Sequence, residues 1–307
     1  MKKHFELTTE TKINFLGLTV FRIKATVKTK YAEEGEIGGW VSSLDNLSGN
    51  AWVYGDAEVS GDALVSGNAL VYGNALVYGD ALVSGDAWVS GNAKVSGNAW
   101  VSGNAKVYGD AEVSGNAKVY GNAKVYGNAK VYGNAKVYGD AEVYGNAKVY
   151  GNAWVYGDAL VYGNAKVYGD ALVSGDAWVY GNAKVYGNAW VYGNAKVYGN
   201  AWVSGDAWVY GNAWVSGNAK VYGNAKVYGD ADIKSNNDWC LFTGFGSENR
   251  TTTAYKIKES LTVKVSCGCF FGDLLEFETQ VKLTHKESKY AREYLSIIDL
   301  IKIKFNL

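Results

Sequence analysis

The side chains best suited to chemistry lie near one another in the last part of this 307-residue chain, at Cys267, Cys269 and His285. Alternate residues of an extended strand share a face, so the two thiols and the imidazole would suit a metal or thiol site. A catalytic Cys–His pair would also need the two side chains to be adjacent in space. No second cysteine pair completes a set of four ligands. We therefore interpret the cysteines as buried structural residues and assign no metal, cofactor or catalytic residue.

A polar, glycine-bearing turn at residues 244–253 carries a single arginine. Arg250, together with Ser247, Asn249 and the backbone N–H groups of such a turn, can hold an anion or an acidic group of a partner. The same composition is typical of an ordinary β-hairpin. Both interpretations of the turn stay open.

A strict internal repeat dominates the fold that must position these side chains. The segment from Gly49 to Lys234 consists of 31 consecutive hexads. In each hexad Gly is first, Asn or Asp second, Ala third and Val or Ile fifth, while the fourth position varies and the sixth is mostly Tyr or Ser. The alternation of Ala, a variable residue and Val is typical of a strand with one buried face, and Gly-Asn or Gly-Asp is a turn dipeptide.

One hexad cannot bury its own Ala/Val face, so we expect triangular coils of three hexads stacked on one another. The variable and Tyr/Ser positions should then face solvent. Hexads such as residues 53–58 (Val-Tyr-Gly-Asp-Ala-Glu) resemble the hexapeptide-repeat, left-handed parallel β-helix family. The left hand is what this resemblance implies. Residues 37–42 fit the frame, and residues 43–48 fit it poorly but keep Leu47 at the aliphatic position, so we predict a mainly β solenoid of about 10–11 coils over residues 37–234.

The segments outside the repeat are predicted to close the two ends of the solenoid. Residues 1–36 alternate as two strands and are expected to form an N-terminal β-hairpin cap. Residues 235–307 are interpreted as a small α/β module of three strands (residues 238–243, 252–257 and 261–266) and two helices, which begin after Asp273 and near Ser288. This module also resembles a C-terminal module of repeat proteins from bacteria and their phages, at residues 268–270 (Gly-Cys-Phe) and 276–278 (Glu-Phe-Glu). That resemblance implies no known activity.

Hexapeptide-repeat proteins are best known as acyltransferases, which use a His from a coil as general base. Residues 49–234 contain no His, Cys, Arg or inserted loop, so the acyltransferase and metal-dependent anhydrase interpretations are rejected and we predict that the protein is not an enzyme. The 11 Asp at the second hexad position are scattered among Asn. They are not grouped as the 6–8 converging oxygen ligands that calcium needs.

The variable position of every third hexad should stack on the same face, which arranges these residues in three lanes. Two lanes are rich in Trp and Leu, and a large exposed apolar stripe marks a contact surface. Lys residues in the same lanes would limit each stripe to a discrete patch. The alternative is that Trp simply favours strands and stacks along ladders. We predict association into a homo-oligomer, favouring a dimer, through Trp154, Leu172, Trp190 and Trp208 of one lane and Trp178 and Trp214 of the next.

The composition of the chain limits which partners and which cellular location are expected. Thirty basic residues balance 30 acidic ones, so neither nucleic-acid binding nor binding to an anionic membrane is expected. The sequence shows no apolar run typical of a signal peptide or a membrane span, and we predict a cytoplasmic or phage-associated protein. The predicted function is a non-enzymatic scaffold or binding rod with a C-terminal interaction or assembly module. The alternatives are a phage or prophage accessory protein that binds and inhibits or sequesters a host component, and, third, an enzyme carried by the C-terminal module.

Overall fold

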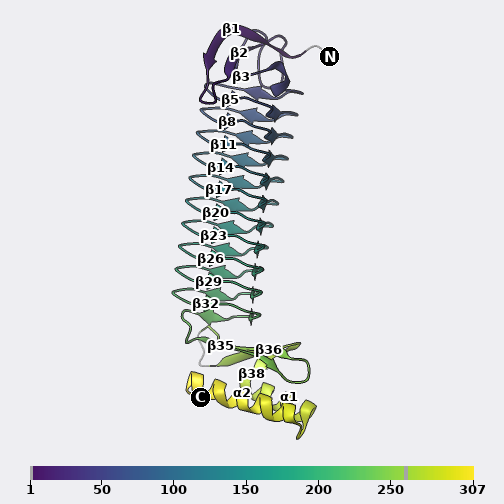
Figure 1. The fold of residues 1–307 in the computed structure, drawn as a ribbon, viewed down its shortest axis with the longest axis vertical. Helices are drawn as coiled ribbons and strands as arrows, with labels where there is room; N and C mark the ends of the chain where they lie inside the picture. Colours follow the sequence, from purple (N-terminus) through teal and green to yellow (C-terminus); the bar gives the residue numbers. More distant parts are fainter. Residues whose placement is uncertain (1–2, 259–261) are drawn as a thin grey trace. The chain divides into compact units, whose positions relative to one another are not determined.

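A computed structural model describes residues 3–258 and 262–307, which fall into two units, Met1–Asn164 and Ala165–Leu307 (Figure 1). In both units each hexad forms a two-residue strand from its variable residue and its Val or Ile. Each strand is parallel to the strand three hexads further along the chain, so that Lys106 pairs with Lys124 and Val107 with Val125. The prediction of three hexads per coil is therefore confirmed. The left-handed sense stays a prediction from the resemblance.

The first unit contains three sheets, in which successive strands come from successive coils. Figure 1 shows β5, β8, β11 and β14 as consecutive rungs of the first of these sheets. A short 3-10 helix (Leu44–Asn46) precedes the regular repeat. The first sheet contains β1 (Phe5–Ile13), β2 (Thr19–Ala25), β3 (Ile37–Val41), β5 (Glu58–Val59), β8 (Leu76–Val77), β11 (Lys94–Val95), β14 (Glu112–Val113), β17 (Lys130–Val131) and β20 (Lys148–Val149). The second contains β4 (Trp52–Val53), β7 (Leu70–Val71), β10 (Trp88–Val89), β13 (Lys106–Val107), β16 (Lys124–Val125), β19 (Glu142–Val143) and β22 (Leu160–Val161). The third contains β6 (Leu64–Val65), β9 (Leu82–Val83), β12 (Trp100–Val101), β15 (Lys118–Val119), β18 (Lys136–Val137) and β21 (Trp154–Val155).

The second unit continues the same three-sheet pattern and ends in a separate antiparallel sheet with two helices. Its repeat strands are β23 (Lys166–Val167), β26 (Lys184–Val185), β29 (Trp202–Val203) and β32 (Lys220–Val221); β24 (Leu172–Val173), β27 (Trp190–Val191), β30 (Trp208–Val209) and β33 (Lys226–Val227); and β25 (Trp178–Val179), β28 (Lys196–Val197), β31 (Trp214–Val215) and β34 (Asp232–Ile233). The C-terminal module contains β35 (Trp239–Phe245), β36 (Arg250–Lys256), β37 (Val263–Cys267), β38 (Phe270–Asp273), α1 (Leu274–His285) and α2 (Lys289–Phe305).

The small and branched residues of each hexad fill the interior of the coils. The Ala and Val side chains of the repeat are almost completely buried, as at Ala105 and Val107, both 0% exposed. The first hexad position needs glycine at the corners. Gly85 has a φ of +68°, and a Cβ there would lie 2.9 Å from the backbone nitrogen of Gly103 in the next coil. Both the positive φ and the close approach exclude other residues.

The corner and sixth positions stack into ladders along the coils. The side-chain amide of Asn104 donates to the Oδ1 of Asn122 at 3.0 Å, and Asn122 donates in turn to Asp140 at 2.9 Å. The rings of Tyr108 and Tyr126 are parallel, with their centroids 4.8 Å apart. Asp can therefore replace Asn as the acceptor of a ladder bond, but only Asn also donates to the next rung.

The N-terminal hairpin is present as predicted, and it extends the first sheet. Strands β1 and β2 are antiparallel, and β2 is also antiparallel to β3, which is parallel to β5. Phe5, Val20 and Ile23 form its buried face. The expectation that every variable position faces solvent is wrong here, because Trp52 and Glu58 are 0% and 4% exposed. The hairpin covers the outer faces of the first coils.

The C-terminal module has four strands where three are expected from the sequence. The additional strand is β38, which is antiparallel to β37 and directly precedes α1. Both predicted helix starts are confirmed, since the side chains of Asp273 and Ser288 cap α1 and α2. Leu261, at which the sequence places the start of the third strand, lies outside the described residues. Phe277, Val281, Tyr294 and Ile298 pack against the sheet as a small core.

Candidate functional site

The first coils present backbone carbonyl groups that have no preceding coil to bond with. Along the repeat, the N–H groups of the second, fourth and sixth hexad positions donate to carbonyls of the next coil, as Lys106 does to Ala123 at 2.9 Å. At the N-terminal end, side chains of the cap and of the 3-10 helix Leu44–Asn46 supply the missing partners. The Lys3 ammonium donates to the carbonyl of Leu47 at 3.2 Å, and the Asn46 amide donates to the carbonyls of Gly61 and Ala63 at 2.9 and 2.8 Å.

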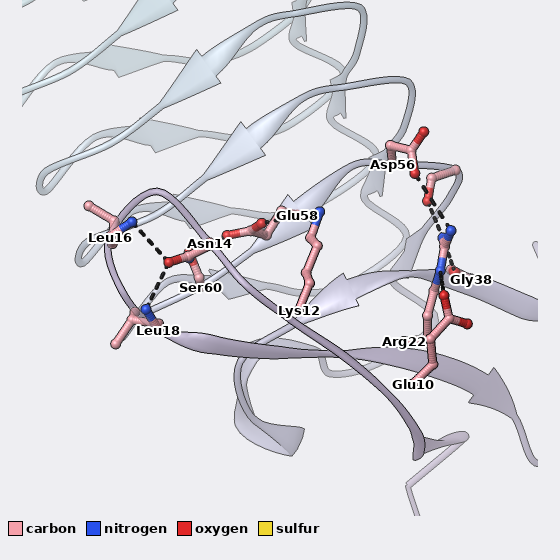
Figure 2. A network of polar contacts seen from close by, with 11 residues as sticks. Glu10, Lys12, Asn14, Leu16, Leu18, Arg22, Gly38, Asp56, Glu58 and Ser60 are labelled. Carbon is pink, nitrogen blue, oxygen red and sulfur yellow. Dashed lines mark hydrogen bonds and ion pairs between the residues drawn. The ribbon is translucent and has the colours of Figure 1, made fainter.

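A polar network in the N-terminal cap holds the hairpin to the first coil (Figure 2). The Asn14 amide donates to Glu58 at 2.5 Å, and the Lys12 ammonium lies 3.7 Å from the same carboxylate. On the other side of the hairpin, Arg22 donates to the carbonyls of Gly38 and Gly55 and forms an ion pair with Asp56. This end of the solenoid is therefore closed by hydrogen-bond donors.

The last coil lacks hydrogen-bond acceptors, because its N–H groups have no following coil to donate to. Four backbone donors meet side-chain oxygens of the C-terminal segment instead. Lys226 donates to Thr253 at 3.1 Å and Tyr228 to Tyr255 at 3.1 Å, and the remaining two donate to Asn236 and Asp238. The C-terminal module thus closes this end with hydrogen-bond acceptors.

Asp238 joins the end of the repeat to the module. Its carboxylate accepts from the backbone and hydroxyl of Ser235 and lies 2.8 Å from the Lys256 ammonium. Burial alone would raise the pKa of Asp238, but the bonds from Lys256 and Ser235 outweigh burial, and the pKa falls below its ordinary value.

A stacked aromatic strip lies on one sheet of the second unit. Leu172, Trp190 and Trp208 occupy equivalent positions of β24, β27 and β30. The indole rings of Trp190 and Trp208 are parallel, with their centroids 5.0 Å apart, and Trp190 is 39% exposed. We call these three residues the Trp strip. Lys226, next in the same sheet, places its ammonium 5.0 Å from the Trp208 ring.

The other predicted association residues differ from the Trp strip in having no Trp–Trp stack, and lysines lie over their rings as Lys226 does over Trp208. The Lys196 ammonium lies 4.4 Å from the ring of Trp178 and 5.4 Å from that of Trp214. In the first unit, Lys136 lies 4.2 Å from the Trp154 ring. The sequence predicts such lysines only as interruptions of an apolar lane. The sequence nevertheless contains a pattern that could have indicated these cation–π contacts. Lys and Trp occupy the variable positions of hexads that lie one coil apart.

A cavity of about 400 Å³ opens in the C-terminal module between the sheet and α1. Arg250, Cys267, Cys269 and His285 all line it. Its remaining walls are mostly aromatic or apolar, and include Phe270, Phe277 and Tyr294. The structure thus brings together four reactive or charged side chains that form two separate groups in the sequence.

The cysteines of this cavity have different environments. Cys267 is buried, accepts from the Thr252 hydroxyl at 3.3 Å and lies 3.8 Å from the Tyr294 hydroxyl. Cys269 is exposed, so the expectation that the cysteines are buried is wrong for this residue. Gly268, with a φ of +60°, ends the extended strand between them. Burial, helped by the adjacent Cys267, raises the pKa of Tyr294, which stays a neutral hydrogen-bonding group.

The predicted anion loop is a hairpin turn between β35 and β36, and only one of its named residues lines the cavity. Ser247 and Asn249 are exposed in the turn, and Asn249 adopts a φ of +48°. Arg250 begins β36 and reaches the cavity. Gly246 is fixed from the other side, since its N–H donates to the Glu293 carboxylate at 2.8 Å.

Comparison with protein-family models shows what the repeat is similar to. The model described as "YdcK Beta solenoid repeat" matches residues 69–85, 75–91, 141–157, 165–181, 177–193, 189–205 and 195–211. These matches fall on the stacked parallel coils. The chain is a β-solenoid repeat protein. Its solenoid has about 11 turns. No curated protein matches the chain.

Two further properties of the solenoid protein concern metals and membranes. Among residues 3–258 and 262–307, no group of three or more His, Cys, Asp or Glu side chains is placed to hold a metal ion. Within those same ranges, neither helix is long and apolar enough to cross a membrane.

Proposed function

We propose that this β-solenoid protein is a non-enzymatic scaffold that forms a dimer through its Trp strip. The observation that carries the proposal is the parallel stack of Trp190 and Trp208, in which Trp190 is left 39% exposed beside Leu172. A stack on a rigid sheet is preorganised, so little side-chain entropy is lost when a second molecule covers it.

The energetics of the strip favour burial against a second copy. A tryptophan side chain buries about 150–250 Å², and each Å² of apolar surface removed from water contributes about 25 cal/mol. Only the exposed share remains to be buried on association, so Trp190, 39% exposed, supplies about 2 kcal/mol per copy and the partly exposed Trp208 adds to it, before the cost of association is subtracted. The formal charge of zero adds no long-range repulsion between two copies. Lys226 ends the strip, which suits a closed pair better than an open array.

The non-enzymatic part of the proposal rests on the uniform repeat. Residues 49–234 carry no His, Cys or Arg, and their polar side chains form ladders with copies of themselves. A surface of similar rungs offers regular spacing along each sheet, which suits a scaffold. In the same proposal, the C-terminal module serves the scaffold by closing its last coil.

The double variant Trp190→Lys/Trp208→Lys tests the Trp strip. Four charges facing each other across a symmetric interface should leave a folded protein with half the mass of the parent, by light scattering and circular dichroism. The matched control is Trp202→Lys, because Lys184 and Lys220 already lie 4.4 and 4.7 Å from that ring. The control should keep the parental mass.

Two results would overturn this proposal. An unchanged mass of the folded double variant would show that the tryptophans only stabilise the sheet. A parent protein that is itself monomeric would exclude self-association and leave a host or phage protein as the partner to seek.

A further inference from the structure

The cavity of the C-terminal module combines one unpaired cation with aromatic walls. Its volume of about 400 Å³ falls within the range of small-molecule sites, roughly 300–1,000 Å³. No Asp or Glu is among the described residues that line it. Its electrostatic character is therefore set by Arg250 of β36, and His285, at the end of α1, also lines it.

The Arg250 side chain is exposed, and its guanidinium lies close to Gly268. An added Cβ at Gly268 would be only 2.5 Å from Nη1. Within the described part of the chain, no carboxylate forms an ion pair with Arg250, and no hydrogen bond from it is found. Glu293 of α2 accepts from the Gly246 N–H at 2.8 Å. The five N–H donors of Arg250 thus remain available for a planar anion.

The aromatic walls define the other half of the ligand. The rings of Phe270 and Phe277 lie 5.1 Å apart, and the Tyr294 ring meets Phe277 edge-on at 5.8 Å. The His285 ring stacks on Tyr294 at 5.4 Å. Such a cluster favours an aromatic body through offset and edge contacts. Gln280 and Thr284 add polar groups to the lining.

We propose that this cavity binds a small aromatic carboxylate. The carboxylate pairs with Arg250 in a bidentate manner, and the ring packs against Phe270, Phe277 and Tyr294. Bidentate pairing supplies orientation as well as affinity. The site is independent of the Trp strip and does not depend on dimerisation.

Calorimetric titration of the full-length protein with phenylacetate as the probe tests the proposal. Phenylacetate should bind at one site per chain, and the neutral analogue phenylacetamide should bind at least about tenfold more weakly. Arg250→Gln should lose about tenfold or more in affinity, whereas the matched control Arg292→Gln, outside the cavity, should bind as the parent does. Arg250→Lys should fall between them, because it keeps the charge and loses the fork.

A second measurement keeps the test decisive if Arg250→Gln does not fold. Cys269 is exposed and lines the cavity, so phenylacetate should slow its alkylation by iodoacetamide in the parent protein. Cys240 is not among the lining residues and serves as the internal control; burial raises its pKa to about 11. Equal affinity for phenylacetamide, or for inorganic phosphate, would overturn the proposal, as would unchanged alkylation of Cys269 at saturating phenylacetate.

Discussion

Single residues decide how the hairpin cap attaches to the first coil, and Glu58 is the clearest case. It occupies a variable hexad position, yet it is 4% exposed and receives Asn14 and Lys12 from the hairpin. Asn14 in turn uses its Oδ1 to accept from the N–H groups of Leu16 and Leu18, both at 2.9 Å. The carboxylate thus fixes a side chain that itself shapes the hairpin turn (Figure 2).

Glu58→Ala should therefore destabilise the protein by about 1–3 kcal/mol, because Lys12 loses its ion pair and the part-buried Asn14 amide keeps only the Ser60 hydroxyl, at 3.2 Å, as an acceptor. The free energy of unfolding from urea titration measures this loss. Glu112→Ala is the matched control, since Glu112 pairs with Lys130 at 2.9 Å on an open surface. An exposed pair contributes about 0–1 kcal/mol. Equal, small losses in both variants would show that Glu58 does not hold the cap.

The environment of a side chain at a variable position could be predicted from the sequence only where the repeat is regular. The lane positions of Trp190 and Trp208 follow from the hexad count, and the structure stacks them as that count requires. Glu58 and Trp52 could not be predicted as buried, because the hairpin that covers them is not part of the repeat. The meeting of Arg250 with Cys269 and His285 depends on the packing of α1 against the sheet, which no local pattern specifies.

At the scale of elements, the two caps solve opposite hydrogen-bonding problems. Lys3 of the N-terminal cap and Asn46 of the following 3-10 helix present donors to carbonyls, and the C-terminal module presents acceptors such as Thr253 and Tyr255 to N–H groups. Composition shifts in the sequence located both caps, and the alternation in residues 1–36 predicted a hairpin. The fourth strand β38 was missed because its short span, Phe270–Asp273, is too brief to show a period.

Thr253→Val tests the capping of the last coil. Valine matches threonine in shape but has no acceptor, so the Lys226 N–H would be left without a partner. We expect a loss of about 1–3 kcal/mol in the free energy of unfolding. Thr253→Ser keeps the hydroxyl and should lose less than half as much. If the serine variant is as unstable as the valine variant, the methyl group and not the hydrogen bond matters at this position.

At the scale of the whole molecule, stability should be distributed over nearly equivalent coils, because each coil bonds only to its neighbours. The pairing of each strand with the strand three hexads further along sets the unit that can be removed. Removal of a single hexad preserves the frame of the repeat, whereas only removal of three hexads preserves the lane of every variable residue.

Deletion of the three hexads at residues 103–120 should give a shorter, folded protein with a slightly lower melting temperature by circular dichroism. Lys136 would take the place of Lys118 beside Trp100, so the cation–π contact survives. Deletion of the single hexad at residues 103–108 should also give a folded protein but should shift the lanes, and any function of the lanes should be lost. An unfolded three-hexad deletion would show that the coils are not energetically equivalent.

The opposite chemistry of the two ends has a consequence for polymerisation. A bare first coil offers mainly acceptors and a bare last coil mainly donors, so the two ends of uncapped molecules are complementary templates for head-to-tail growth. Loss of one cap alone does not start such growth. The exposed edge could pair only with the opposite end of another copy, and the second cap still covers that end. A filament requires both caps to fail, and each cap is thus a separate safeguard against it.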